Sequence, residues 1–112
     1  MSELDLYIVF SSPKPNRESD AVAWYDEVHL PELLELEEVV SAQRFELASA
    51  AGTHRFMAVY ECASSGSETA DAIASAMASG SKTVTDSLKS DEMLRVIYSP
   101  ATQRLTSPDT AD

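Results

Sequence analysis

The chain has 112 residues, 44% of them hydrophobic, and its 19 acidic and 8 basic residues give a net charge of −11. This length fits one domain, which we expect over residues 1–105, followed by a disordered polar tail over 106–112. The acidic balance argues against binding to nucleic acid or to an anionic membrane surface, because both are bound through Lys and Arg.

Residues 4–10 form the first regular pattern of the chain. Leu6 and Ile8 fall on one face of this stretch, and Tyr7 and Val9 fall on the other. Alternation with a period of two predicts a strand, and apolar residues on both faces predict that each face is at least partly covered. Two prolines then make the following residues a loop.

The next pattern predicts a helix that begins at Ser19 or Asp20, since either side chain is a suitable cap. Pro31 should interrupt the helix near Leu30, because the residue before a proline avoids helical backbone angles. An apolar stripe with helical spacing should face the core, and it consists of Ala21, Trp24, Tyr25 and Val28.

A hairpin is predicted in the middle of the chain. Residues 39–47 and 55–62 both read as strands, and Gly52 is the natural pivot of the turn between them. An Ala-rich helix is then expected over 68–79, with Gly80 as its C-terminal glycine. The cap of this helix is Ser67, and its inner face is expected to be Ala70, Ile73, Ala74 and Met77.

The last part of the chain is the least regular. Residues 81–91 are polar and predict a short helical turn or a flexible connection. Residues 93–98 read as the last core strand, in which Leu94 and Val96 oppose Met93. Residues 101–105 could continue as an edge segment.

This order of strand, helix, strand, strand, helix and strand predicts an α+β fold of the ferredoxin-like type, with an antiparallel sheet and both helices on one face. The strands carry apolar residues on both faces, so the face without helices also requires cover. A second copy related by a two-fold axis would supply it. We therefore expect a homodimer through the sheet faces, the alternative being a monomer with exposed apolar surface.

Cys62 is the only cysteine, which excludes an intrachain disulfide and is compatible with a reducing compartment. The sequence shows no signal-peptide pattern and no apolar run of about 18 residues. We therefore expect a cytoplasmic protein that does not span a membrane. Three glycines leave little room for a phosphate-binding loop or a dinucleotide fingerprint.

The stretch Trp24-Tyr25-Asp26-Glu27-Val28-His29-Leu30-Pro31-Glu32-Leu33 resembles the motif of EthD-like proteins in the dimeric α/β-barrel superfamily. Residues 39–45 are similar to the second strand of that family, which commonly ends in an Arg-aromatic pair. Glu37 and Glu38 stand where the family often has Pro-Gly. The resemblance implies a dimer formed through the sheets and a pocket in each subunit between sheet and helices.

His29 is the main candidate for chemistry, because an imidazole suits general acid or base catalysis near neutral pH. The alternative is a histidine at a helix end that bonds a free carbonyl. Asp26 lies three residues earlier and could orient the imidazole, or it could belong to a solvated acidic face with Glu27. These residues are too few for a metal site, and we expect no metal and no cofactor.

Five further residues are candidates for ligand binding. Trp24 and Tyr25 precede His29 on the predicted helix, although large aromatic residues most often serve the core. Arg44 could hold a carboxylate or a phenolate-type oxygen, or else form a salt bridge with Glu46 or another surface acid. Tyr60 and Tyr98 could donate hydrogen bonds to a bound carbonyl from neighbouring strands.

Three functions remain open on the sequence. The first is a small cofactor-independent enzyme in which His29 moves a proton on an apolar, aromatic or oxygenated substrate. The second is a non-catalytic or stress-associated module that binds a hydrophobic ligand in the same pocket. The third is a haem-handling protein with His29 as axial ligand.

Overall fold

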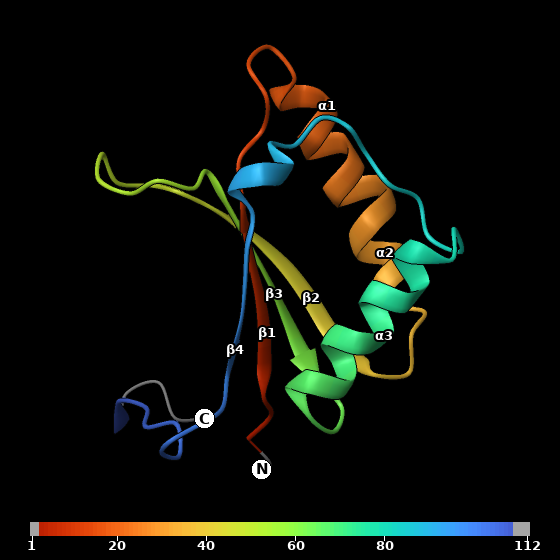
Figure 1. The fold of residues 1–112 in the computed structure, drawn as a ribbon. Helices are drawn as coiled ribbons and strands as arrows, with labels where there is room; N and C mark the ends of the chain where they lie inside the picture. Colours follow the sequence, from red (N-terminus) through yellow and green to blue (C-terminus); the bar gives the residue numbers. More distant parts are fainter. Residues whose placement is uncertain (1–2, 109–112) are drawn as a thin grey trace.

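The computed structural model describes residues 3–108, which form an α+β structure with one four-stranded antiparallel sheet (Figure 1). The strand order is β2-β3-β1-β4, so the first and third strands lie in the middle. All helices pack on one face of the sheet. This architecture is compatible with the expected ferredoxin-like fold. The strands are β1 (Leu6–Ser11), β2 (Val39–Glu46), β3 (Phe56–Cys62) and β4 (Leu94–Tyr98).

The alternation predicted for the first strand is confirmed, with a shift of its bounds. Tyr7 and Val9 point toward the helices and Ile8 points to the opposite face, and all three side chains are buried. Tyr7 lies opposite Tyr60 on β3 and opposite Ile97 on β4, so three strands contribute residues to the covered face at this level. The core of the domain lies between this face and the helices.

A continuous helical run joins β1 to β2. It consists of α1 (Glu18–Ala23), the π-helix η1 (Trp24–His29) and α2 (Leu30–Leu33). The prediction of a cap at Ser19 or Asp20 is wrong, because the run begins at Glu18 after Arg17, which makes no side-chain cap. The predicted interruption near Leu30 is also wrong.

The chain stays helical through Pro31, which follows directly on the π-helical turn in the first residues of α2. Pro31 has no N–H and therefore donates no hydrogen bond to the preceding turn. The change in hydrogen bonding occurs upstream instead. The N–H of Leu30 donates to the carbonyl of Tyr25, five residues earlier, as in a π-helix.

The second long helix, α3 (Gly66–Ala78), begins two residues before the predicted position. Its cap is Ser65, whose hydroxyl accepts a hydrogen bond from the N–H of Glu68. Gly80 lies just after the helix with a φ of 82°, which confirms its role as a C-terminal glycine.

The segment after α3 runs back across the helical run and returns to the sheet (Figure 1). It has no α-helical turn, and its only helical residues are the 3-10 turn η2 (Ser90–Glu92). Two backbone hydrogen bonds anchor its end, from Lys14 N to Ser87 O and from Lys89 N to Ser12 O. Residues 101–105 form no strand, contrary to the edge segment we expected, and 106–108 are exposed. The rest of the predicted tail, 109–112, lies outside the described residues.

Two segments project on the side of the sheet that carries no helices. The first is the hairpin over residues 47–55, between β2 and β3, and the second is the segment after β4 (Figure 1). Between them lies a sheet face with apolar residues at Ile8, Val59 and Val96, which are neighbours in register. No helix in the described part of the chain is both long and apolar enough to cross a membrane.

We predict that Gly66→Ala destabilises the fold. A Cβ atom at this position would lie 2.3 Å from Cγ2 of Ile97 on β4, which is far inside contact distance. Overpacking of this kind costs roughly 1–3 kcal/mol in free energy of unfolding. Chemical denaturation should show this loss in the single variant and a smaller loss when Gly66→Ala is introduced into an Ile97→Ala background. Equal losses in both backgrounds would rule out this contact as the cause.

Candidate functional site

A cavity of about 450 Å³ lies between the sheet and the helices. The sheet contributes Tyr7, Val9, Tyr60 and Arg95, and the helical run contributes Trp24, Tyr25, His29 and Leu33. The wall is completed by Ile73, Ala74, Met77 and Ala78 of α3 and by Met93 before β4. The volume lies in the range of small-molecule sites, and an apolar wall with few polar groups is typical of them.

The π-helical turn determines how the aromatic residues of this wall meet. The rings of Trp24 and His29 stack with centroids 4.1 Å apart and planes inclined by 16°. Residues five apart point in widely different directions on an α-helix, which has 3.6 residues per turn. The wider π-turn brings them to one side. Single π-turns of this kind occur frequently at functional sites.

Tyr25 is the buried centre of this aromatic group. Its side chain is 1% exposed, and its ring meets those of Trp24, His29 and Phe56 edge-on. Its hydroxyl shares a hydrogen bond of 2.9 Å with Ser11 Oγ of β1. Burial raises the pKa of the Tyr25 phenol, so the group is a neutral hydrogen-bonding side chain at physiological pH.

His29 is 7% exposed, and its Nδ1 has no hydrogen-bond partner. Burial lowers the pKa of His29 to about 4, and the negative charge of Glu32 opposes this shift only in part. The imidazole is therefore neutral near pH 7. A neutral ring has one nitrogen that can accept a proton without first losing one.

Tyr60 resembles His29 in lacking a partner. Its side chain is 1% exposed, its hydroxyl has no hydrogen-bond partner, and burial raises its pKa well above the ordinary value. Unpaired buried polar atoms cost about 1–3 kcal/mol each, so two in one cavity require an explanation. Hydrogen bonds from a ligand to these side chains would remove this cost.

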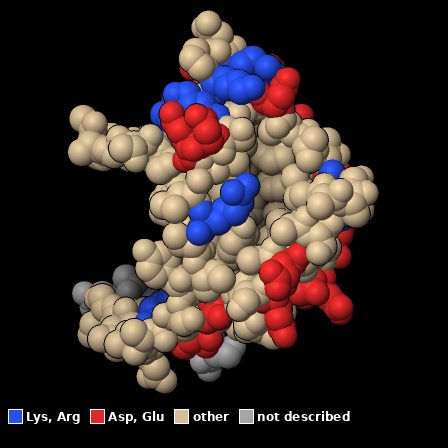
Figure 2. Space-filling view, viewed as in Figure 1, with Lys and Arg blue, Asp and Glu red and all other residues tan. Residues whose placement is uncertain are grey.

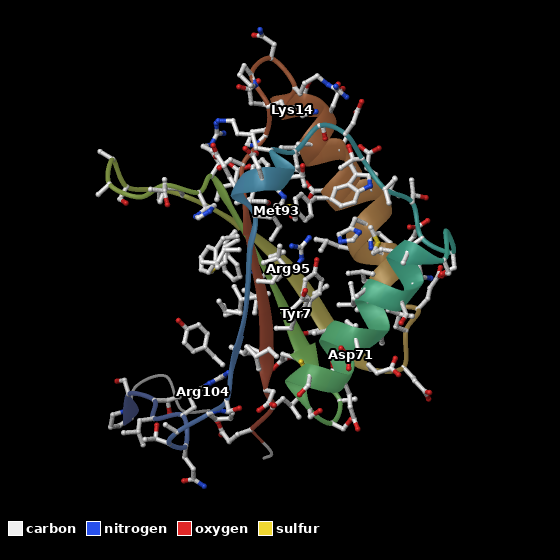
Figure 3. All side chains as sticks on the ribbon, in the orientation of Figure 1. Tyr7, Lys14, Asp71, Met93, Arg95 and Arg104 are labelled. Atoms are coloured by element: carbon white, nitrogen blue, oxygen red, sulfur yellow. The ribbon has the colours of Figure 1, made fainter. Side chains whose placement is uncertain are left out.

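Arg95 reaches the same cavity from β4 (Figure 3). Burial raises the pKa of the Tyr7 phenol, and the charge and hydrogen bonding of Arg95 oppose this shift. The positive charge of Arg95 also opposes the rise in the pKa of the Tyr25 phenol. The pocket therefore has a positive side at β4 and a neutral aromatic side at η1.

Asp26 and Arg44 form an ion pair with each other, a partner that neither role predicted for Asp26 included. The two carboxylate oxygens of Asp26 accept hydrogen bonds of 2.8 and 2.9 Å from Arg44, which also bonds to Glu46 at 2.6 Å. The guanidinium lowers the pKa of the Asp26 carboxyl. Asp26 is thus engaged with Arg44, while Nδ1 of His29 stays unpaired. The alternative role proposed for Arg44, a salt bridge with Glu46, is the one observed.

Of the five residues predicted to bind ligand, three line the cavity together with His29, namely Trp24, Tyr25 and Tyr60. Arg44 and Tyr98 do not belong to its wall. Tyr98 is 60% exposed, and it lies opposite Leu6 at the far end of the sheet. The direction of its side chain places it on the face away from the helices.

Tyr7 and Arg95 were missed by sequence reasoning. The signal for both was available in the alternation of their strands, because Tyr7 shares a face with Val9, and Arg95 lies between Met93 and Ile97 on one face of β4. Because Arg95 shares the helix-covered face of β4 with apolar residues, its presence in the sequence indicated a positive charge next to the pocket.

The segment after α3 fastens the outer side of the helical run. Thr83 accepts a hydrogen bond from Trp24 Nε1 at 3.2 Å, and its own N–H and hydroxyl donate to Glu32 at 2.7 and 2.9 Å. Lys82 forms an ion pair of 2.8 Å with Glu35. These contacts hold the Trp24 ring from outside while its other contacts face the cavity.

The described residues contain no group of three or more His, Cys, Asp or Glu side chains that could hold a metal ion. His29 is the one histidine among the residues of the cavity wall, and an imidazole has the chemistry of an axial haem ligand. The other histidine, His54, bonds with its neighbour Thr53 and the carbonyl of Glu92.

Comparisons of the chain with protein-family models, with curated proteins and with solved structures found no match.

We predict that burial of neutral His29 makes stability depend on pH. The pKa of His29 is about 4 in the folded state and 6.5 for a free side chain, so the unfolded chain takes up a proton first as the pH falls. Protonation of His29 therefore costs no folding stability well above pH 6.5. As the pH falls from 6.5 toward 4, the free energy of unfolding decreases. Relative to His29→Phe, which keeps an aromatic ring on Trp24, the wild type should lose about 2 kcal/mol between pH 7 and 4.5. Urea denaturation curves of both proteins that shift in parallel with pH would contradict this.

Proposed function

We propose that this chain is an EthD-like protein of the dimeric α/β-barrel superfamily with a ferredoxin-like subunit. Its pocket binds a small hydrophobic or aromatic oxygenated molecule, and His29 transfers a proton on that molecule. The observation that carries the proposal is that two residues lining one apolar cavity, His29 and Tyr60, each carry a buried polar atom without a hydrogen-bond partner, Nδ1 and Oη. The two atoms provide a base and a hydrogen-bond donor for an oxygenated substrate.

The chemistry follows from the protonation states. His29 is neutral, so it can take a proton from a carbon next to a carbonyl or from a hydroxyl group. The Tyr60 phenol stays protonated, so its hydroxyl can donate to the oxygen on which negative charge develops. Isomerase, cyclase, lyase and oxygenase reactions can all begin with such a proton transfer.

A second candidate is a binding module without catalysis, and the pKa of His29 favours it. A base with a pKa of about 4 has a low affinity for protons, which limits its driving force at neutral pH. The same pocket would then hold its ligand by apolar contact and by hydrogen bonds to Tyr60 and His29.

We predict that the protein accelerates hydrogen exchange at the α-carbon of 1-indanone, a small aromatic ketone, in D₂O. Proton NMR would follow loss of the α-CH₂ signal at neutral pD, and general base catalysis should contribute roughly 10²-fold or more over buffer. His29→Gln should return the rate to the buffer value, and Tyr60→Phe should lower it. Tyr98→Phe is the matched control, because this tyrosine is 60% exposed and lies outside the cavity.

The two candidates give different results in this experiment. Exchange that requires His29 supports the enzyme. If indanone changes the fluorescence of Trp24, the only tryptophan, without any exchange above buffer, the binding module is supported and catalysis by His29 is excluded for this ligand class. Exchange that is equally fast in His29→Gln would remove His29 from the mechanism.

The homodimer forms part of the same proposal. The apolar face with Ile8, Val59 and Val96 carries no helix, and the hairpin over 47–55 projects on that side. Exposed hydrophobic residues extend this face to Phe45, Leu94 and Tyr98. Large exposed apolar patches mark interfaces, and a self-complementary face closes on itself by a two-fold axis.

We predict a solution mass of twice the 12.2 kDa chain by light scattering. Val96→Glu, in the middle of the open sheet face, should give a monomer, since a buried unpaired carboxylate opposes association. Val84→Glu is the matched control, because Val84 is 63% exposed on the segment that covers the helices. A monomeric wild type would refute the dimer.

A further inference from the structure

We propose that the ligand of this pocket is an anion, with an apolar or aromatic body in the cavity and a carboxylate on the guanidinium of Arg95. This inference rests on the proposed function of the pocket, and it names the class of its ligand. It does not depend on whether His29 is catalytic.

The first observation is the place of Arg95. Its strand β4 is paired with β1 so that Arg95 lies opposite Val9, and both residues line the cavity. Figure 2 shows basic atoms in the middle of this face, beside a hollow between sheet and helices, and Figure 3 places Arg95 at that point. Arg95 is an exposed residue, so its guanidinium is accessible from solvent as well as from the cavity.

The second observation is that Arg95 forms no ion pair with the carboxylates of the described residues. Of the seven other cations, Arg17, Arg44, Lys82 and Lys89 each pair with at least one carboxylate. Like Arg95, Lys14, Arg55 and Arg104 form no ion pair within residues 3–108, but of these four only Arg95 lines the cavity. Arg95 instead contacts neutral groups, with Nη2 at 3.8 Å from the sulfur of Met93 and an interaction with the Tyr7 phenol. A guanidinium has five N–H donors in a planar fork, which matches a carboxylate.

The third observation is the composition of the pocket wall. None of its lining residues is acidic, although the chain carries 19 Asp and Glu residues. Three other surface hollows all contain acids, among them Glu37 and Glu68 in the first, Glu61 in the second and Asp26 in the third. The pocket is thus a local exception in a chain with a charge of −11, and it carries a single positive charge.

These observations select among ligand charges. A cationic ligand would meet Arg95 without a carboxylate in the wall to balance it. A neutral ligand would gain no ionic contact from the guanidinium, which is exposed and stays hydrated. A carboxylate would accept charge-assisted, bidentate hydrogen bonds from the Arg95 guanidinium. The aromatic wall at Trp24 and Tyr25 would then contact the apolar body of the ligand. The wall is neutral elsewhere, because burial keeps His29 uncharged near pH 7.

The test compares three probes of nearly equal size, namely 3-phenylpropanoate, 3-phenylpropanamide and 3-phenylpropylammonium. Binding to the full chain is measured by calorimetry and by the fluorescence of Trp24, which lines the cavity. We expect the carboxylate to bind at least tenfold more tightly than the amide, and the ammonium ion to bind most weakly. The affinity of the carboxylate should also fall as salt is added.

The variants identify the residue responsible. In Arg95→Gln, the affinity for 3-phenylpropanoate should fall to the affinity for 3-phenylpropanamide. Arg95→Lys should retain part of the preference for the carboxylate, because lysine keeps the positive charge but lacks the planar, bidentate guanidinium. Arg104→Gln is the matched control, because it removes the same charge outside the cavity wall, and it should keep the full preference. Thermal midpoints measured in parallel establish that each variant is folded.

Other outcomes would overturn the inference in distinguishable ways. If carboxylate and amide bind equally and Arg95→Gln changes neither, the anion site is refuted while the pocket stands. If none of the probes binds but indanone exchange still requires His29, the ligand class is wrong and the proposed function survives. If neither indanone nor any probe gives a response, both proposals fail.

Discussion

The packing of Tyr25 between the helical run and the sheet is the contact on which the pocket depends. Its ring touches Trp24 and His29 on its own helix and Phe56 on β3, and its hydroxyl meets Ser11 on β1. One side chain therefore fixes both the distance and the rotation of the helix relative to the sheet. Because the buried hydroxyl has a partner, the residue brings no unpaired polar atom with it. Among the described residues, the buried side-chain atoms without a partner are Nδ1 of His29 and Oη of Tyr60, and both residues line the cavity beside Tyr25.

The sequence predicted the elements well where the signal is local. Alternation identified the strands, and the glycine after α3 identified its end, because these patterns depend on neighbouring residues only. The covered and open faces of β1 followed from the same alternation. Three of the predicted ligand residues and His29 lie in one cavity because they belong to faces that any helix-on-sheet packing must bury.

Other features depend on contacts between distant residues and were out of reach. The π-turn over Trp24–His29 has the composition of an ordinary helix, and only its packing sets the wider register. Asp26 lies three residues from His29, yet its partner is Arg44, 18 residues away, because the sheet brings a full positive charge to it. The sequence pattern led us to Arg44 as a ligand residue and not to Arg95, which is the arginine that lines the cavity. The two arginines differ in their acidic neighbours: Arg44 pairs with Asp26 and Glu46, whereas Arg95 forms no ion pair within the described residues. This difference is visible only in the folded structure.

The edge strand β4 has a further consequence for the order of events during synthesis. It is the last element of the fold, and it pairs only with β1, the first. Met93 and Arg95 therefore join the pocket wall after nearly the whole domain has left the ribosome. Until then, the side of β1 that will carry β4 is an open edge whose backbone groups are free to pair with another chain. Completion of the binding site and protection of that edge are thus a single event, which requires the synthesis of β4.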